Sequence, residues 1–232
     1  MIDGVLRAVR QTLWEKVPRD HRQSERNLRR RQLVTAGFVV LGAGLLALSL
    51  RIEPGSTLFY PATLGLAAVW TVGAFTSGPL HLGRTLRGAE PGPRPVAMPV
   101  VYGALLAGLF VLGGLVVRQI PELDAQVRHV LDHAQHGSAP LLIVITALNG
   151  VAEELFFRGA LYAATTRHPV IVTTVAYTAA TLATGNVMLA FAALLLGLLV
   201  GLERRATGGI MAPIITHVLW SVSMLFVLPA LF

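Results

Sequence analysis

The chain contains no cysteine and few charged residues, and both absences narrow what it can be. Without cysteine there are no disulfides, no thiolate metal ligands and no cysteine nucleophile. Charged residues make up 13% of the 232 residues, against roughly 25% in an average soluble domain, while 54% are hydrophobic. A composition this apolar is typical of an integral membrane protein, and the length predicts one domain-sized bundle of helices.

The N-terminal segment also lacks the short apolar core and small-residue cleavage site of a removable signal peptide, so we expect none. Residues 1–31 are polar and basic. We interpret residues 1–17 as an amphipathic helix in the membrane interface, ended by Pro18 and followed by a solvated basic linker. A floppy charged tail is the alternative. The apolar side chains that recur at helical spacing are Ile2, Val5, Leu6, Val9, Leu13 and Val17.

The net charge is +7, and the basic residues flank the apolar stretches rather than forming one patch on a soluble domain. We therefore expect no nucleic-acid partner, and anionic lipid headgroups as the partner of the basic N-terminus.

Long apolar stretches predict an all-α, polytopic transmembrane helix bundle of about seven spans. Several approach the ~20 residues that a crossing needs. The fifth and sixth are shorter and are joined only by Gly185 and Asn186, so tilted or re-entrant segments, and six or eight spans, stay open. The stretches are 32–50, 58–78, 96–117, 140–163, 169–184, 187–202 and 209–231.

Arginine placement predicts the orientation of these spans. Basic residues occur in the N-terminal segment and in the predicted connections at 79–95, 164–168 and 203–208, where Arg204 and Arg205 lie. The alternate connections carry only Arg51, Arg118 and Arg128. The positive-inside rule then places the N-terminus in the cytoplasm and the C-terminus outside.

The segment 118–139 resembles a second interfacial helix, between three N-terminal spans in 32–117 and the last spans in 140–232. Its histidines His129, His133 and His136 fall on one side, near Asp132. Two histidines at i and i+4 can share a metal ion. We prefer a polar face that titrates with pH. The opposite, apolar face consists of Ile120, Leu123, Val127, Val130 and Leu131.

Two adjacent carboxylates interrupt the fourth span. An ionised carboxylate at the centre of a bilayer costs at least ~2.5–3.5 kcal/mol, and two neighbours also repel. Arg158 follows Glu154 by one helical turn, so these two can pair on one face. Glu153 has no such local partner and is therefore the first candidate for a chemical role.

Further polar residues fall at a similar depth. Tyr177 and Thr181 lie one turn apart on the fifth span, and His217 and Ser221 one turn apart on the last. At ~1.5 Å per residue, they and the glutamates lie roughly 10–20 Å from the cytoplasmic side. We expect them to converge on one cavity open to the cytoplasm.

The letters EELFFR, from Glu153 to Arg158, match the EExxxR motif of the CAAX protease and bacteriocin-processing (CPBP, or ABI) family of intramembrane endopeptidases. The stretch from Ile215 to Ser221 resembles the last motif of that family, a histidine followed four residues later by a polar residue. The resemblance covers about residues 140–225. It implies a type II CAAX prenyl endopeptidase-like core that hydrolyses a peptide bond of a membrane-associated substrate, in the inner membrane of a bacterium.

The resemblance also implies roles for the matched residues. Glu153 would activate water as general base, and Arg158 would orient Glu154. His217 would stabilise the oxyanion, assisted by Ser221. A carboxylate base and an imidazole donor in a low-dielectric site suit that chemistry.

One motif departs from the family pattern. Where the family has an aromatic residue and a histidine four residues later, this chain has Tyr177 and Thr181. Threonine can hold a water but binds metal poorly, so we expect a metal-free glutamate mechanism without a cofactor. The alternative is a catalytically weakened pseudo-protease that acts as a membrane scaffold. An ion transporter ranks last, since the chain has no inverted repeat.

Structural interpretations of the same residues stay open. Glu154 and Arg158 form an ion pair that can serve helix packing alone, and His217 can bond a backbone carbonyl of a neighbouring helix. Tyr177 is predicted to be a packing residue, and Thr181 at most holds a water. Asn186 is a further polar candidate without an assigned place.

Overall fold

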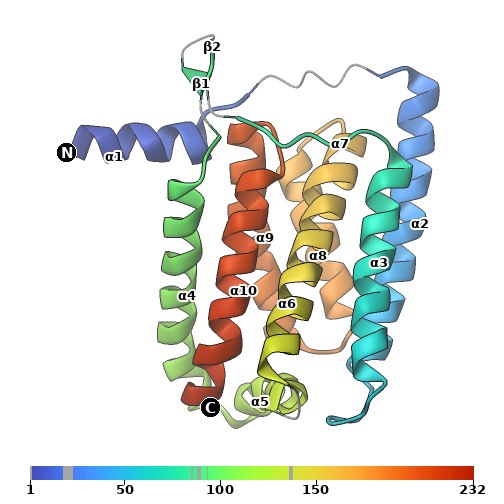
Figure 1. The fold of residues 1–232 in the computed structure, drawn as a ribbon, viewed down its shortest axis with the longest axis vertical. Coiled ribbons are helices and arrows are strands. Elements are labelled where there is room, and N and C mark those ends of the chain that lie inside the picture. Colours follow the sequence, from blue (N-terminus) through green and yellow to red (C-terminus); the bar gives the residue numbers. More distant parts are fainter. Residues whose placement is uncertain (1, 18–22, 85, 88–89, 93, 136–137) are drawn as a thin grey trace.

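The computed structural model describes all residues except 1, 18–22, 85, 88–89, 93 and 136–137. The described residues form a bundle of helices with one small antiparallel hairpin, whose strands have two residues each (Figure 1). The predicted all-α fold class is confirmed.

The element bounds follow the apolar stretches of the sequence closely. In chain order they are α1 (Ile2–Val9), the π-helical η1 (Arg10–Trp14), α2 (Glu25–Ser49), α3 (Phe59–Ser77), β1 (Leu86–Arg87), β2 (Glu90–Pro91), α4 (Ala97–Val117), α5 (Pro121–Gln135), α6 (Ala139–Glu154), the π-helical η2 (Leu155–Leu161), α7 (Tyr162–Ala164), α8 (Pro169–Leu182), α9 (Val187–Thr207) and α10 (Met211–Leu231).

Six helices are long and apolar enough to cross a membrane: α2, α3, α4, the continuous helix Ala139–Ala164, α9 and α10. The 14 residues of α8 form a shorter apolar helix. It extends about 21 Å, less than the ~30 Å hydrocarbon core. The helices run alternately up and down, so α1 and the C-terminus lie at opposite ends of the bundle (Figure 1). A transmembrane bundle is confirmed, and α8 is the short helix among the seven predicted spans.

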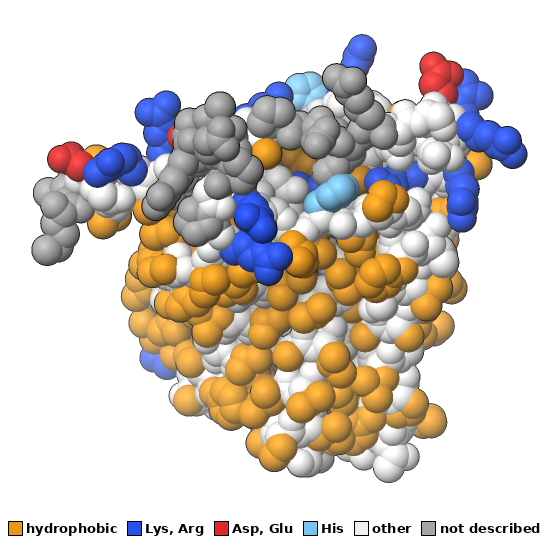
Figure 2. Space-filling view, turned by 45° about the horizontal axis from the view of Figure 1, so that its top comes forward, with side chains coloured by type: hydrophobic (Ala, Val, Ile, Leu, Met, Phe, Trp, Pro, Cys, Tyr) orange, Lys and Arg blue, Asp and Glu red, His pale blue; other side chains and the backbone are white. Residues whose placement is uncertain are grey.

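The flanks of the bundle are apolar. Figure 2 shows hydrophobic side chains over the sides and Lys and Arg gathered mainly at the end that carries α1. Leu105, Leu112 and Val40 are 66%, 64% and 74% exposed. The free energy of such side chains is lower among lipid tails than in water. The chain is an integral membrane protein.

Two predicted boundaries were wrong. The sixth span was expected to be short and to end before a basic turn at 203–208, but α9 continues through Arg204 and Arg205 to Thr207. Glu203 and Arg204 are 0% and 3% exposed. Inside the bundle, Glu203 Oε1 lies 2.9 Å from Thr216 Oγ1 and Arg204 Nε donates to the carbonyl of Arg158, so both side chains have partners in neighbouring helices and the helix continues past them.

The other difference is the start of the first span. The prediction placed residues up to 31 in a solvated linker, yet α2 begins at Glu25, and the Ser24 hydroxyl caps it by accepting from Asn27 N. Arg31 is 2% exposed and donates to the carbonyls of Ser77 and Pro79. These bonds join α2 to the end of α3.

The N-terminal helix lies across the end of the bundle, roughly at right angles to the long helices (Figure 1). The described part of this segment docks through its π-helical end, η1. Thr12 Oγ1 lies 2.7 Å from the Tyr102 hydroxyl on α4, and Arg205 on α9 donates to Leu13 O. This orientation agrees with the predicted interfacial helix.

The interfacial helix predicted at 118–139 is α5, which crosses the opposite end of the bundle (Figure 1). Asn186 donates to Gln126 O on α5, and its own Oδ1 caps α9 by accepting from Leu189 N. Asn186 is therefore a connection between helices, far from the carboxylates.

The histidines of α5 make backbone contacts. His133 is 5% exposed, and its Nε2 and Nδ1 lie 2.8 and 3.1 Å from the carbonyl oxygens of Ile52 and His129. His136 falls outside the described residues. The described residues contain no group of three or more His, Asp or Glu that could hold a metal ion.

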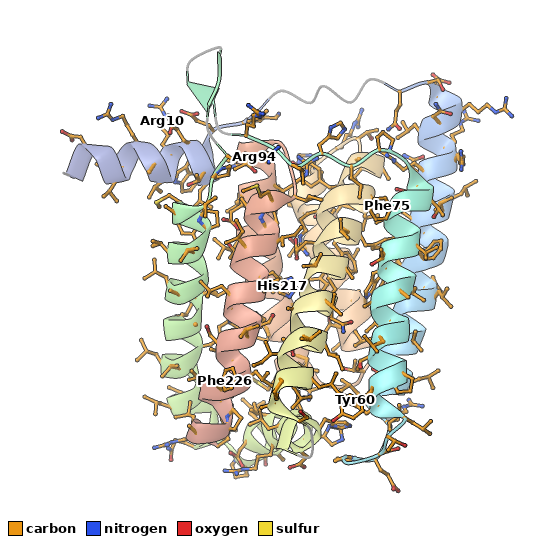
Figure 3. All side chains as sticks on the ribbon, viewed as in Figure 1. Arg10, Tyr60, Phe75, Arg94, His217 and Phe226 are labelled. Carbon is orange, nitrogen blue, oxygen red and sulfur yellow. The ribbon has the colours of Figure 1, made fainter. Side chains whose placement is uncertain are left out.

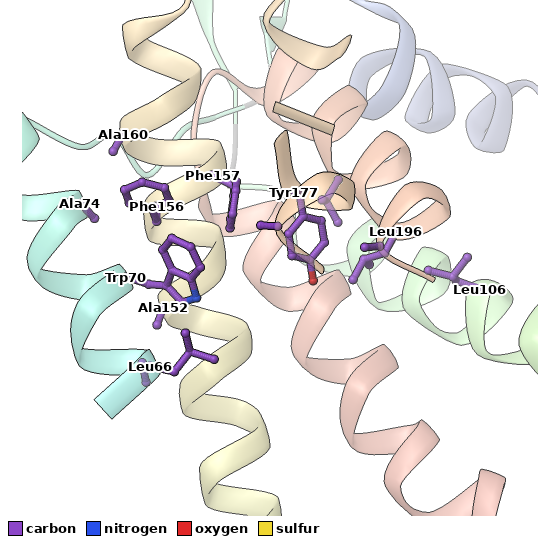
Figure 4. Packing of buried hydrophobic residues seen from close by; sticks show 14 residues of the cluster. Leu66, Trp70, Ala74, Leu106, Ala152, Phe156, Phe157, Ala160, Tyr177 and Leu196 are labelled. Carbon is purple, nitrogen blue, oxygen red and sulfur yellow. The ribbon is translucent and has the colours of Figure 1, made fainter. Parts of the chain in front are cut away.

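The core of the bundle is aromatic where α3 meets the middle of Ala139–Ala164, the helix that carries the two adjacent glutamates (Figure 4). Trp70 is 1% exposed, and its ring lies 4.8 and 5.0 Å from the rings of Phe156 and Phe157. Both phenylalanines are fully buried. Because they follow Glu154 by two and three residues, within one helical turn, this packing fixes the rotation of the helix that carries the carboxylates.

Candidate functional site

The polar site lies inside the bundle, between the helices that carry the predicted residues. His217 on α10 is at mid-height of the bundle (Figure 3). Glu153 and Glu154 end α6, where the helix widens into the π-helical turn η2 that carries Arg158. π-helical turns of this kind occur frequently at functional sites.

Glu154 is held by two donors from two helices. Its Oε1 lies 3.0 Å from Arg158 Nη1 and 2.8 Å from His217 Nδ1. All three residues are almost completely buried, and Glu154 and Arg158 are 0% exposed. An ionised carboxylate only accepts hydrogen bonds, so with Glu154 ionised the proton of this contact is on Nδ1 of His217. The interhelical partner of His217 is thus a carboxylate and not a backbone carbonyl.

Glu153 has a different environment. Its Oε2 accepts a hydrogen bond of 2.6 Å from the Tyr177 hydroxyl and lies 3.8 Å from His217 Nε2. The side chain of Glu153 is 15% exposed, whereas that of Glu154 is 0% exposed. The two adjacent carboxylates therefore differ: Glu154 is enclosed and paired, and Glu153 is reachable and faces the second nitrogen of the same imidazole.

The ring of Tyr177 is held from two sides. The guanidinium carbon of Arg158 lies 4.9 Å from its centroid, a cation–π distance, and the Phe157 ring lies 4.9 Å away. Gly197 on α9 leaves room for this stack, since a Cβ there would lie 3.1 Å from Arg158 Nη2 and 3.4 Å from Tyr177 Cδ1. Gly197 is thus next to the site.

Thr181 and Ser221 are less engaged than the other predicted residues. The Thr181 hydroxyl donates to the carbonyl of Tyr177 in its own helix, at 2.9 Å. Ser221 lies one turn beyond His217 on α10 and is half-buried. Among the described residues, none forms a hydrogen bond with the Ser221 hydroxyl. The structure therefore brings together Glu153, Glu154, Arg158 and His217, while the hydroxyls of Thr181 and Ser221 form no hydrogen bond with these four side chains in the described part of the chain.

Tyr177 is the residue that sequence reasoning undervalued. It was predicted to pack, and it also donates to Glu153 from a neighbouring helix. The available signal was its position one turn before Thr181, at the depth of the carboxylates. Nothing in the sequence distinguishes a tyrosine that packs from one whose hydroxyl also reaches a carboxylate.

The part of the chain that forms this site matches a known family. The family model described as type II CAAX prenyl endopeptidase Rce1-like matches residues 135–223. This region is CAAX protease-like. The resemblance inferred from the motifs is confirmed there, and it covers every residue of the polar cluster. No curated protein and no solved structure matches the chain.

The CAAX protease-like region begins at the end of α5 and ends within α10. It contains both glutamates, the tyrosine and the histidine, whereas α1–α4 lie outside it. The match indicates a CAAX protease-type function in the membrane. Of the helices before the match, α3 contributes Trp70 to the packing behind Glu154, and α4 packs against α10.

Proposed function

We propose that the protein is an intramembrane endopeptidase that hydrolyses a peptide bond of a membrane-associated substrate, with Glu153 as general base. The observation that supports the proposal most is the position of Glu153. Its Oε2 lies 2.6 Å from the Tyr177 hydroxyl and 3.8 Å from His217 Nε2. This position leaves one reachable carboxylate beside an oriented imidazole. The CAAX protease-like match over this region supports the same reaction class.

The first step is attack by water. The separation of 3.8 Å between Glu153 Oε2 and His217 Nε2 is too long for a direct hydrogen bond. One water molecule can lie about 2.8 Å from each. Glu153 accepts a proton from this water, and the water oxygen forms a bond to the carbonyl carbon of the substrate. The carbonyl π electrons move to the carbonyl oxygen, which becomes an oxyanion.

His217 then stabilises the oxyanion. Before the attack, Glu153 and Glu154 carry two negative charges and Arg158 one positive charge, so an imidazolium at His217 makes the buried cluster neutral. A neutral cluster is favoured where water is excluded. The imidazolium holds its Nδ1–H on Glu154 and directs its Nε2–H toward the reacting atoms. A donor fixed in this way before the reaction gives strong stabilisation of developing negative charge.

The second step is collapse of the tetrahedral intermediate. The carbon–nitrogen bond breaks, and the proton on Glu153 passes to the departing amine. The products are a carboxylic acid and an amine, and Glu153 is again a carboxylate. Tyr177 keeps the Glu153 side chain in one orientation throughout, because its hydroxyl can donate to the ionised and the protonated carboxyl alike.

We expect the N-terminus to face the cytoplasm of a bacterial cell, with α1 and its basic residues in the lipid interface. The exposed apolar side chains of Val5, Leu6 and Trp14 and the exposed cations of Arg7 and Arg10 suit an anionic membrane surface. The substrate would reach the site from that side of the membrane.

A catalytically weakened scaffold is the second candidate. The observation in its favour is that Thr181, where the family has a histidine, uses its hydroxyl within its own helix. In this case the carboxylates and Arg158 would serve packing, and the protein would bind a membrane partner without cutting it.

Glu153→Gln separates the two candidates. Gln keeps the size and the bond from Tyr177 but cannot take a proton from water. We expect peptide N-termini that appear only in cells with the wild-type protein to disappear with this variant, a loss of roughly 10²-fold or more. Glu53→Gln, an exposed carboxylate at the far end of the bundle, is the matched control. Identical N-terminal profiles for wild type and Glu153→Gln, with equal amounts of inserted protein, would exclude proteolysis and leave the scaffold.

A further inference from the structure

A third buried carboxyl group lies outside the polar site. Glu203 on α9 is 0% exposed. Among the ion pairs that the described residues form, none involves Glu203. The neighbouring arginines point elsewhere: Arg204 Nε donates to Arg158 O, and Arg205 Nη2 to Leu13 O. An ionised carboxylate in such a place would be costly without a cation.

Hydrogen-bond donors indicate that Glu203 is a neutral acid. Its Oε1 lies 2.9 Å from Thr216 Oγ1, which also lies 3.0 Å from the carbonyl oxygen of Pro99. A threonine hydroxyl has one proton and can donate a full hydrogen bond to only one of them. If the Glu203 carboxyl is protonated, it donates to Thr216, which in turn donates to Pro99 O. Both short contacts then contain a proton.

This chain of bonds ends beside the candidate catalytic histidine. Thr216 and His217 are consecutive on α10, so their side chains leave the helix about 100° apart. Thr216 binds α9 and α4, while His217 binds Glu154 on α6. The helix is thus fixed at two adjacent residues by partners in different directions. A rotation of α10 that weakens one set of bonds must move the other.

We propose that Glu203, as a neutral carboxylic acid, is a positioning residue for His217. Through Thr216 it sets the rotation of α10 so that Nδ1 of the imidazole meets Glu154 and Nε2 faces Glu153. The role in catalysis rests on the proposed protease function. The positioning itself does not, and it can be measured without a substrate.

The test compares Glu203→Gln with Glu203→Leu. The glutamine amide can donate to Thr216 as the protonated acid does, whereas leucine fills the space but donates nothing. Thr216→Val removes the hydroxyl from the other side, and Thr216→Ser keeps it. The readout is the ¹⁵N signals of the His217 ring in the full chain in lipid nanodiscs, assigned among the seven histidines by their loss in His217→Asn.

We expect His217 signals like those of wild type in Glu203→Gln and Thr216→Ser, and shifted signals in Glu203→Leu and Thr216→Val. Thermal unfolding identifies any variant that fails to fold, and the Thr216 pair then decides. Unshifted signals in Thr216→Val would overturn the positioning role. A shift in Glu203→Gln as large as that in Glu203→Leu would overturn the neutral acid.

The rate at which each variant cleaves the substrate of the wild-type protein adds a separate readout. Displacement of a catalytic group by about 1 Å can cost roughly 10²-fold in rate, so we expect a loss of that order in Glu203→Leu, with recovery in Glu203→Gln. If the ring signals respond as expected but no variant, wild type included, cleaves any protein, the positioning stands and the protease proposal falls.

Discussion

At the scale of single residues, the hydrogen bond from the Tyr177 hydroxyl to Glu153 gives the sharpest test of the proposed mechanism. Tyr177→Phe removes the 2.6 Å bond to Glu153 but keeps the ring that stacks on Arg158. A hydrogen bond to a charged group contributes about 1.5–3 kcal/mol, so we expect cleavage to fall roughly 10- to 100-fold. The measurement is the rate of product formation on the substrate found through Glu153→Gln.

Tyr60→Phe is the control for this prediction. Tyr60 lies near the opposite end of the bundle from α1, away from the carboxylates (Figure 3). We expect wild-type cleavage from it and similar melting temperatures for both tyrosine variants. Unchanged cleavage by Tyr177→Phe would return Tyr177 to the packing role that the sequence predicted.

Thr181 leads to the opposite expectation. Its hydroxyl donates only to the carbonyl of Tyr177, in the preceding turn of α8. Thr181→Val keeps the shape and removes a bond worth about 1 kcal/mol at most, so we expect cleavage within about fivefold of wild type. A loss comparable to that of Glu153→Gln would show that Thr181 holds the reacting water after all. The same rate assay decides.

The residues of the site were predictable in kind but not in their contacts. Charged residues are rare in an apolar span, so Glu153, Glu154 and Arg158 were visible at once. The bond from Tyr177 to Glu153 depends on how α8 packs against η2, which no local pattern encodes. Glu203 was missed for a related reason, since a glutamate before two arginines is typical of a solvated turn.

At the scale of elements, the contact between α2 and α3 positions the carboxylate helix indirectly. A Cβ at Gly42 would clash with the Trp70 ring, which in turn packs on Phe156 and Phe157. Gly42→Ala forces α2 away from Trp70, and overpacking of this kind costs about 1–3 kcal/mol. We expect a lower melting temperature in detergent.

Gly44→Ala is the matched control on the same helix. A Cβ at Gly44 would meet no atom within 4 Å, so only helix propensity changes, which favours alanine by up to ~1 kcal/mol. We expect an unchanged or higher melting temperature. Equal destabilisation by both substitutions would show that the close contact of Gly42 with Trp70 contributes nothing of its own.

The helix ends show where sequence patterns stop being sufficient. Apolar runs predicted most spans to within a few residues, because a membrane-crossing helix needs apolar length above all. They failed where charged residues continue a helix inside the bundle. Arg31 is satisfied by carbonyls of the α3 end, and Arg204 by the carbonyl of Arg158. Those partners come from distant parts of the chain, so hydropathy alone places such residues in loops.

At the scale of the whole molecule, the distribution of charge predicts the orientation in the membrane. Arg51, Arg118 and Arg128 lie in or beside the connections at the α5 end, whereas the exposed Lys and Arg gather mainly at the end that carries α1 (Figure 2). By the positive-inside rule, a bias of this kind predicts that the basic end faces the cytoplasm. The site would then draw its substrate from the cytoplasmic side.

The absence of cysteine makes this orientation directly measurable. Gly4→Cys and Glu53→Cys each place one thiol at an exposed position, on α1 and in the α2–α3 connection at the far end. We expect a membrane-impermeant maleimide to label Glu53→Cys on intact cells, and Gly4→Cys only after permeabilisation. The wild-type chain, without a thiol, is the blank. The reverse labelling pattern would show that the orientation is opposite to the predicted one. The substrate would then have to reach the carboxylates from outside the cell.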